Sequence, residues 1–155
     1  MNNLAKFFRQ RLYLITNFIV LLTAYYFIFV QPFFPNQNGG LGHDYEMWFP
    51  RMLAGGYYFV INGMSVVPWF TPSCCGGTVF FANPQYLFFS APQFLNFYFD
   101  PITSIQITVM LFAAFGFLGT YLLMRKTFAL KENAAIFAAG LFLFNGFFAY
   151  RIIIG

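Results

Sequence analysis

One stretch of the sequence, GGLGHDYEMWFPRMLAGG at residues 39–56, gathers side chains that can do chemistry. It contains His43, the only histidine of the chain, and the carboxylates Asp44 and Glu46, followed by Arg51. Groups of these types can accept a proton or pair with a charged ligand. Because the surrounding sequence is almost entirely apolar, this stretch is the first candidate for a functional site.

The spacing of these residues limits what they can do together. On a helix, Asp44 and Glu46 point to different faces, whereas Asp44 and Arg51 are seven residues apart and share one. Pro50 is expected to kink such a helix. Two carboxylates are an incomplete oxygen site for a divalent ion, so no metal site is predicted. Asp44 has two open interpretations, a helix N-cap and a functional acid, and the cost of charge near a membrane favours function.

The composition indicates which solvent surrounds the chain. Of its 155 residues, 60% are hydrophobic and 8% are charged. A soluble domain carries about 25% charged residues, so this chain lacks the polar surface to enclose a water-soluble core. The formal net charge of +4 does not form one basic patch, which argues against nucleic acid as a partner. The lipid bilayer is the expected environment.

The two cysteines of the chain, Cys74 and Cys75, are adjacent and are interpreted as small residues in a tight loop.

Three apolar runs are long enough to cross a bilayer as helices, and they are predicted over residues 12–31, 102–124 and 134–153. Basic residues precede the first run and fill the connection at residues 125–133; they are Lys6, Arg9, Arg11, Arg125, Lys126 and Lys131. Since basic connections stay in the cytoplasm, both groups predict a cytoplasmic N-terminus and an external loop over residues 32–101. The first run is interpreted as a retained anchor, because its apolar core is longer than that of a signal peptide.

The external loop is too long and too aromatic for a plain connector. We expect it to carry interfacial helices over residues 44–54 and 84–97. Asp100, before Pro101, is expected to cap the helix that follows. Small residues four apart in the last two apolar runs predict close helix packing, at Gly116, Thr120, Ala135 and Ala139. The expected fold is all-α and integral to the membrane.

Three pieces of the external loop, in this order, resemble the first external loop of the YfhO-like bacterial membrane proteins: DYEMWFPRMLAGG, NGMSVVPWFTPSCCGG and ANPQYLFFSAPQFLN. These proteins are similar to the GT-C glycosyltransferases, which use polyprenyl-phosphate sugars. The matching positions are Asp44, Pro50, Gly63, Pro68, Trp69, Pro72, Gly76, Gly77, Ala82, Asn83, Gln85 and Pro92. The last residues, FFAYRIIIG, resemble the third span of that family. The chain departs from the family pattern at Phe70, Cys74 and Cys75.

The resemblance implies the N-terminal portion of a GT-C-like multispan fold. It also implies transfer of a sugar from a polyprenyl phosphate to an acceptor hydroxyl at the outer membrane face, with Asp44 as the candidate catalytic base. Arg51 and Arg151 are candidates for stabilising the leaving phosphate; the alternative for each is a solvated or snorkelling residue. Asn83 is a candidate for substrate binding with a turn role as its alternative. The remaining substrate-binding candidates are His43, Glu46 and Gln85.

Two other functions stay open at the level of the sequence. One is a membrane transporter or lipid-translocation protein, in which Asp44 and the arginines line a substrate path. The other is a non-catalytic membrane scaffold. Charges that cluster outside the spans favour the enzyme, because transporters bury theirs in broken spans. The expected location is the bacterial cytoplasmic membrane, within the cell envelope. The expected partners are a polyprenyl-phosphate-linked sugar and the remainder of a larger multispan chain, and no cofactor is assigned.

Overall fold

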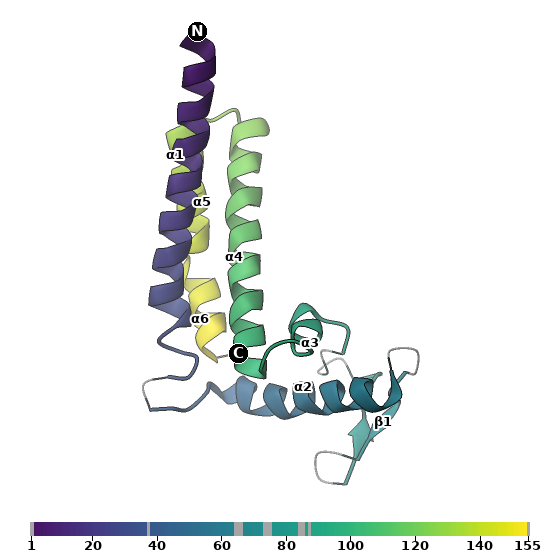
Figure 1. Cartoon of the computed structure of the whole chain (residues 1–155). Helices are drawn as coiled ribbons and strands as arrows, with labels where there is room; N and C mark the ends of the chain where they lie inside the picture. The colour runs from purple at the N-terminus through teal and green to yellow at the C-terminus, as the bar shows by residue number, and fades with distance from the viewer. Residues whose placement is uncertain are drawn as a thin grey trace. The chain divides into compact units, whose positions relative to one another are not determined.

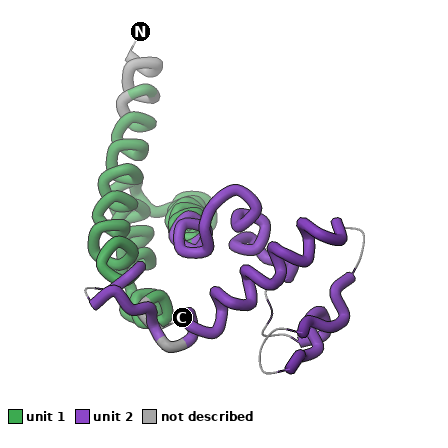
Figure 2. The backbone as a smooth tube through the Cα atoms, turned by 60° about the horizontal axis from the view of Figure 1, so that its bottom comes forward, with its two compact units in different colours: residues 1–33, 109–153 green, residues 34–108, 154–155 purple. Residues whose placement is uncertain are grey.

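The computed structural model describes residues 2–36, 38–63, 67–72, 76–83, 86 and 88–154, and for residues 2–7, 9, 43, 153 and 154 it describes the backbone alone. Most of the described chain is helical (Figure 1). It divides into two compact units (Figure 2). We call residues 1–33 with 109–153 the helical unit, and residues 34–108 with 154–155 the aromatic unit. The residues singled out in the sequence fall in both units.

The helical unit is built from long apolar helices. Helix α1, Asn2–Tyr25, continues as a π-helical turn over Tyr26–Val30. Helix α4 begins in the aromatic unit and belongs to the helical unit from Val109 onward. The helices that complete this unit are α4, Pro101–Lys126, α5, Glu132–Leu143, and α6, Gly146–Ile154.

Three stretches of these helices are long and apolar enough to cross a membrane: Gln10–Val30, Pro101–Lys126 and Glu132–Ile152. The shortest of them have 21 residues. At a rise of about 1.5 Å per residue, that length covers about 31 Å, which matches the hydrocarbon thickness of a bilayer. The expectation of three such helices in a mostly α-helical chain is confirmed.

Small residues bring the helices of this unit close together. Ala135 and Ala139 in α5 are fully buried, and α5 contacts α1. A Cβ added to Gly116 in α4 would lie 2.5 Å from Cε1 of Phe142 in α5, so the ring packs directly on the glycine. The close packing predicted at these three small residues is confirmed. It suits lipid, where shape and van der Waals contact drive helix association.

The third membrane-length stretch is interrupted between α5 and α6. The side chain of Asn145 bridges the break: Nδ2 donates to the carbonyl of Phe142 at 2.8 Å, and Oδ1 accepts from the amide of Phe148 at 3.1 Å. One residue therefore satisfies a carbonyl at the end of α5 and an amide at the start of α6. These are the groups that a helix end leaves without partners. The break was not expected from the sequence.

The aromatic unit combines one long helix with short elements. Helix α2 is His43–Asn62, and helix α3 is Ala91–Leu95. Strands β1, Phe70–Thr71, and β2, Thr78–Val79, form an antiparallel pair in which Phe70 faces Val79. One core cluster of this unit is mostly aromatic, and its buried members are Phe59, Phe80, Tyr86 and Phe88.

Helix α2 is longer than predicted. It was expected over residues 44–54, but it continues to Asn62, and Pro50 lies inside it without ending it. Its buried positions, 49, 52, 55 and 59, keep the spacing of one helix face through the whole length. Gly63 ends the helix with a φ of 71°, a left-handed conformation that glycine adopts without a steric penalty.

Helix α3 is shorter than the helix predicted over residues 84–97. Ser90, with an extended backbone, is its N-cap, and its Oγ accepts a hydrogen bond from the amide of Gln93 at 3.4 Å. Pro92, a residue favoured in the first turn of a helix, is the second residue of α3. The cap and the proline together start the helix at Ala91, several residues after the predicted start at residue 84.

Candidate functional site

The first turn of α2 carries both acidic side chains of the stretch that opened the sequence. Gly42 is the N-cap residue, with an extended backbone and no side-chain cap, and Asp44 and Glu46 follow within the first turn. Of the two interpretations left open for Asp44, the N-cap is therefore wrong. Its carboxylate instead lies just inside the helix, where the positive end of the helix dipole interacts favourably with a negative charge.

Asp44 and Arg51 lie on one face of α2. The helix is continuous between them, and their separation corresponds to nearly two turns and to about 10 Å along the axis. Both side chains are half-buried, whereas Glu46 is exposed. The pair presents a possible proton acceptor and a cation on one face of the helix.

Arg51 is positioned by an aromatic ring. Its Cζ lies 4.8 Å from the ring centroid of Tyr86, a cation–π contact with a residue of the buried core. Such a contact contributes about 0.5–1 kcal/mol when it is exposed to solvent. The backbone of Asn83 forms the turn that leads to this ring, since its carbonyl accepts from the amide of Tyr86 at 3.0 Å. The turn role considered for Asn83 is therefore present.

Aromatic side chains also surround the start of α2. Tyr45 meets Phe34 edge-on at 4.9 Å between ring centroids and stacks on Phe49 at 6.0 Å. The side-chain amide of Gln106, near the start of α4, donates to the carbonyl of Phe34 at 3.0 Å. Within the aromatic unit, these contacts hold the beginning of α2 against the segment that precedes it and against α4.

Two amide side chains hold α3 against α2. Gln93 and Asn96 both donate to the carbonyl of Met52, at 3.2 and 3.3 Å, and Gln93 is only 2% exposed. The contact requires glycine on α2, because a Cβ at Gly55 would lie 2.7 Å from Oε1 of Gln93 and one at Gly56 would lie 3.1 Å from Nδ2 of Asn96. We call this contact the amide clasp. Both amides donate to the carbonyl of Met52, the residue after Arg51, so the amide clasp holds the backbone of α2 next to Arg51.

The other candidate residues of the sequence are not gathered at this face. His43 is the first residue of α2, but its side chain lies outside the described residues, as does the whole of Gln85. Arg151 is exposed in the last turn of α6, in the helical unit, whereas Asp44 belongs to the aromatic unit. Among the side chains that the structure describes, no group of three or more His, Cys, Asp or Glu residues is placed to hold a metal ion.

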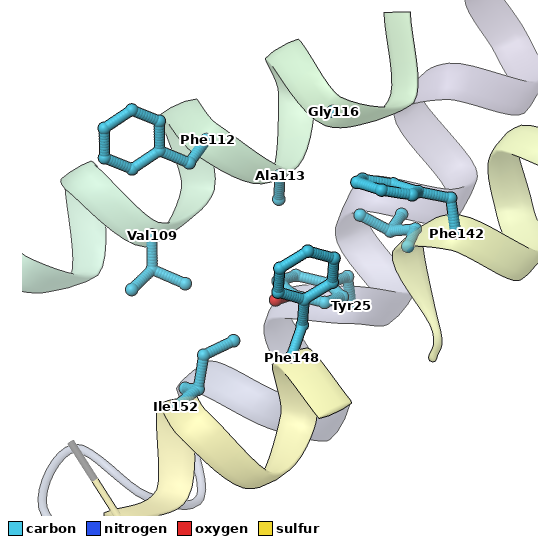
Figure 3. Close-up of a pocket in the computed structure, with 9 residues that line it drawn as sticks. Tyr25, Val109, Phe112, Ala113, Gly116, Phe142, Phe148 and Ile152 are labelled. Carbon is cyan, nitrogen blue, oxygen red and sulfur yellow. The ribbon is translucent and has the colours of Figure 1, made fainter. Parts of the chain in front are cut away.

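A pocket of about 390 Å³ lies within the helical unit beside the break in the third membrane-length stretch. Phe142 and Phe148, on either side of the break, both line it, and their ring centroids are 5.1 Å apart (Figure 3). Tyr25 contributes the only side-chain oxygen among the lining residues. The other lining residues are Val109, Phe112, Ala113, Gly116, Leu143 and Ile152. The pocket is suited to an apolar group rather than to a charged one.

Asp100 caps α4, as predicted. Its carboxylate accepts hydrogen bonds from the hydroxyl of Thr103 and, at 3.0 Å, from the backbone amide of the same residue. The hydroxyl of Thr103, followed by its backbone amide, lowers the pKa of the Asp100 carboxyl below its usual value. Both donors favour the ionised form, which is the form that caps a helix.

Comparisons with protein-family models, with curated proteins and with solved structures each found no match to this chain. The class of protein is therefore described from its structure alone. The protein is a mostly α-helical chain with three stretches long and apolar enough to cross a membrane, and its aromatic unit follows the first of them in the sequence and includes the start of the second.

Proposed function

We propose that this chain is part of a membrane glycosyltransferase, which transfers a sugar from a polyprenyl-phosphate donor to an acceptor hydroxyl at the outer face of the bacterial cytoplasmic membrane. The observation that carries the proposal is the half-buried carboxylate of Asp44 in the first turn of α2, on the same face as Arg51. The resemblance to the external loop of YfhO-like proteins supports the substrate class, because Asp44 falls at the position where that family has its aspartate.

In the proposed reaction, the oxygen of the acceptor hydroxyl attacks the anomeric carbon of the donor sugar, and Asp44 accepts the proton of that hydroxyl. A bond forms between the acceptor oxygen and the anomeric carbon. The bond from that carbon to the phosphate oxygen breaks, and the lipid phosphate leaves with the electron pair. Arg51, oriented by Tyr86, stabilises the charge that develops on the leaving phosphate.

Three of the remaining candidate residues have supporting roles in this proposal: Asn83, Gln85 and His43. Asn83, in the turn before Tyr86, and Gln85 bind sugar hydroxyls. His43 contacts the acceptor at the start of α2. Glu46 is exposed and points to a different face of the helix from Asp44, and Arg151 belongs to the helical unit, so neither is given a role in this site. Of the three supporting residues, Asn83 has the most direct structural support, because its backbone turn adjoins the ring that holds Arg51.

The test is sugar transfer in membranes that contain the protein, with a labelled polyprenyl-phosphate sugar as donor. Asp44→Asn removes the base and is expected to lower transfer by about 10²-fold or more. Glu46→Gln is the matched control, since it makes the same change of charge in the same turn at an exposed position, and it should leave transfer within about twofold of wild type. Equal activity of wild type and Asp44→Asn would refute the assignment of the base.

A second candidate function is a transporter or lipid-translocation protein, and one observation favours it. The third membrane-length stretch is broken at Asn145, beside the apolar pocket, and broken helices accompany substrate sites in transporters. Reconstituted vesicles distinguish the two candidates. Movement of a labelled lipid between leaflets without any sugar transfer would favour translocation, whereas transfer that Asp44→Asn abolishes would favour the enzyme.

A further inference from the structure

The net positive charge of the chain is concentrated at one end of the helical unit. Six of the eight basic residues lie near the N-terminus or around the connection from α4 to α5: Lys6, Arg9, Arg11, Arg125, Lys126 and Lys131. Glu132 is the single acidic residue of these two segments. Figure 1 shows the N-terminus of α1 and the connection between α4 and α5 at the same end of the three long helices.

Side chains from three helices line an open pocket of about 350 Å³ at this end. Arg11 and Gln10 of α1 line it, together with Arg125 and Lys126 in the last turn of α4. The hydroxyl-bearing Tyr121 and the apolar Leu14 and Leu122 line it on the side that leads along the helices, and Glu132 of α5 adds one negative charge. Three cations against one carboxylate give the pocket a net positive charge.

The geometry of the pocket leaves donors for an anion. Nη1 of Arg125 donates to the carbonyl of Leu130 at 2.6 Å, which closes the connection and fixes the guanidinium in place. A guanidinium has five N–H donors, so this bond uses only a part of its capacity. Helix α5 begins beside the pocket, and its N-cap residue, Lys131, makes no side-chain cap hydrogen bond. The start of a helix favours a negative charge, because its first amides point outward and the helix dipole is positive there.

We propose that this pocket binds the phosphate of an anionic phospholipid headgroup. The phosphate lies among Arg11, Arg125 and Lys126, and the acyl chains run along Leu14 and Leu122. The ligand is a lipid because the pocket combines cations with apolar residues at the end of helices long enough to cross a membrane. Basic pockets between membrane helices bind such headgroups, and the predicted orientation places this end at the anionic cytoplasmic leaflet. The proposal does not depend on sugar transfer.

The experiment measures lipid binding to the whole chain in detergent by native mass spectrometry, with phosphatidylglycerol and phosphatidylcholine as probes. The double variant Arg11→Gln, Lys126→Gln is expected to weaken phosphatidylglycerol binding about 25-fold, because each basic residue near the lipid phosphate contributes about fivefold. Lys131→Gln is the matched control: it removes one charge at the same end but does not line the pocket, and its effect should stay below about twofold. Helical content, measured by circular dichroism, must be equal in all variants for the comparison.

Three results would overturn the proposal. One is equal binding of phosphatidylcholine and phosphatidylglycerol by the wild type. Another is a decrease in phosphatidylglycerol binding for Lys131→Gln as large as that for Lys126→Gln alone. That result would indicate a general effect of surface charge instead of binding in the pocket. The third is competition by soluble glycerol phosphate at the concentration at which the lipid itself saturates, which would assign the site to a free phosphate. If the double variant does not fold, the single variant Lys126→Gln, at an exposed helix position, tests the proposal in its place. It should weaken phosphatidylglycerol binding about fivefold, and unchanged binding would overturn the proposal.

Discussion

Replacement of Gly55 by alanine is a direct test of the amide clasp between α2 and α3. In an exposed helix this change is favourable, because alanine has a higher helix propensity than glycine by about 1 kcal/mol. Here Gly55 is buried against Gln93. The structure therefore predicts the opposite sign, and the size of the effect follows from the distances in the clasp.

The added methyl group would lie 2.7 Å from Oε1 and 3.0 Å from Cδ of Gln93, a side chain that is 2% exposed. Overpacking of this kind costs about 1–3 kcal/mol. Displacing the Gln93 amide from the carbonyl of Met52 costs about 1 kcal/mol more, and the helix propensity of alanine offsets about 1 kcal/mol. The net destabilisation is about 2 kcal/mol, which lowers the Tm by about 4–8 °C for a chain of this length.

The measurement is thermal unfolding of the purified protein in detergent micelles, followed by circular dichroism. Gly55→Ala is made in the wild type and in a Gln93→Ala background, which removes the side chain that the methyl group meets. In that background Gly55→Ala should raise the free energy of unfolding by about 1 kcal/mol, because only the propensity term remains. The clasp as described would be refuted by the same change in Tm in both backgrounds, or by stabilisation of the wild type.

Three further changes test other parts of the structure. Gly116→Leu should destabilise the helical unit by about 1–3 kcal/mol through its contact with the neighbouring ring, whereas Gly119→Leu, with nothing near its Cβ, should not; equal Tm values would contradict the packing. Because Thr103 lowers the pKa of Asp100, the stabilisation from Asp100 is complete near neutral pH and is lost as the pH falls through its folded pKa, which lies below the ordinary value of an aspartate. The free energy of unfolding, measured at several pH values, should no longer show this acid-dependent decrease in Asp100→Asn. A decrease that persists in the variant would mean that another group causes it. Asn145→Ala should cost about 1 kcal/mol and speed hydrogen exchange in the first turn of α6, and unchanged exchange would mean that the side chain does not hold the break.

The helices of this chain could be predicted because their signals are local. Apolar length alone indicates a membrane-length helix, and small residues four apart indicate a packed face. The burial of Ala135 and Ala139 and the ring that covers Gly116 follow from that pattern. Asp100 was equally accessible to prediction, since a cap depends only on the next few residues.

The candidate site was predicted in part. The shared face of Asp44 and Arg51 follows from helix periodicity and needs nothing beyond the continuous helix. The N-cap position was wrong by two residues, because glycine also occupies N-caps and Gly42 provides the extended backbone there. The contact of Arg51 with Tyr86 joins residues far apart in the sequence, and no local pattern indicates it.

Two features were missed although the sequence contains a signal for each. The pair Gly55 and Gly56 inside a helix indicates a close approach by another part of the chain, but the partners, Gln93 and Asn96, are about 40 residues further on. The break at Asn145 is signalled by an Asn-Gly pair within an apolar run, which is a turn signal. Apolar length outweighed that signal in the prediction of a third span.

The site on α2 and the lipid pocket are both assigned to particular faces of the membrane, so both proposals require the predicted orientation of the chain. Thiol labelling in intact cells tests it, with Cys74 and Cys75 replaced by alanine. Gly40→Cys and Phe128→Cys are suitable reporters, since both positions are exposed and a Cβ at Gly40 meets only the side chain of Asn36, at 3.6 Å. A membrane-impermeant reagent should label Gly40→Cys in intact cells and Phe128→Cys only after the membrane is opened. The reverse pattern would contradict the proposed placement of Asp44 at the outer face.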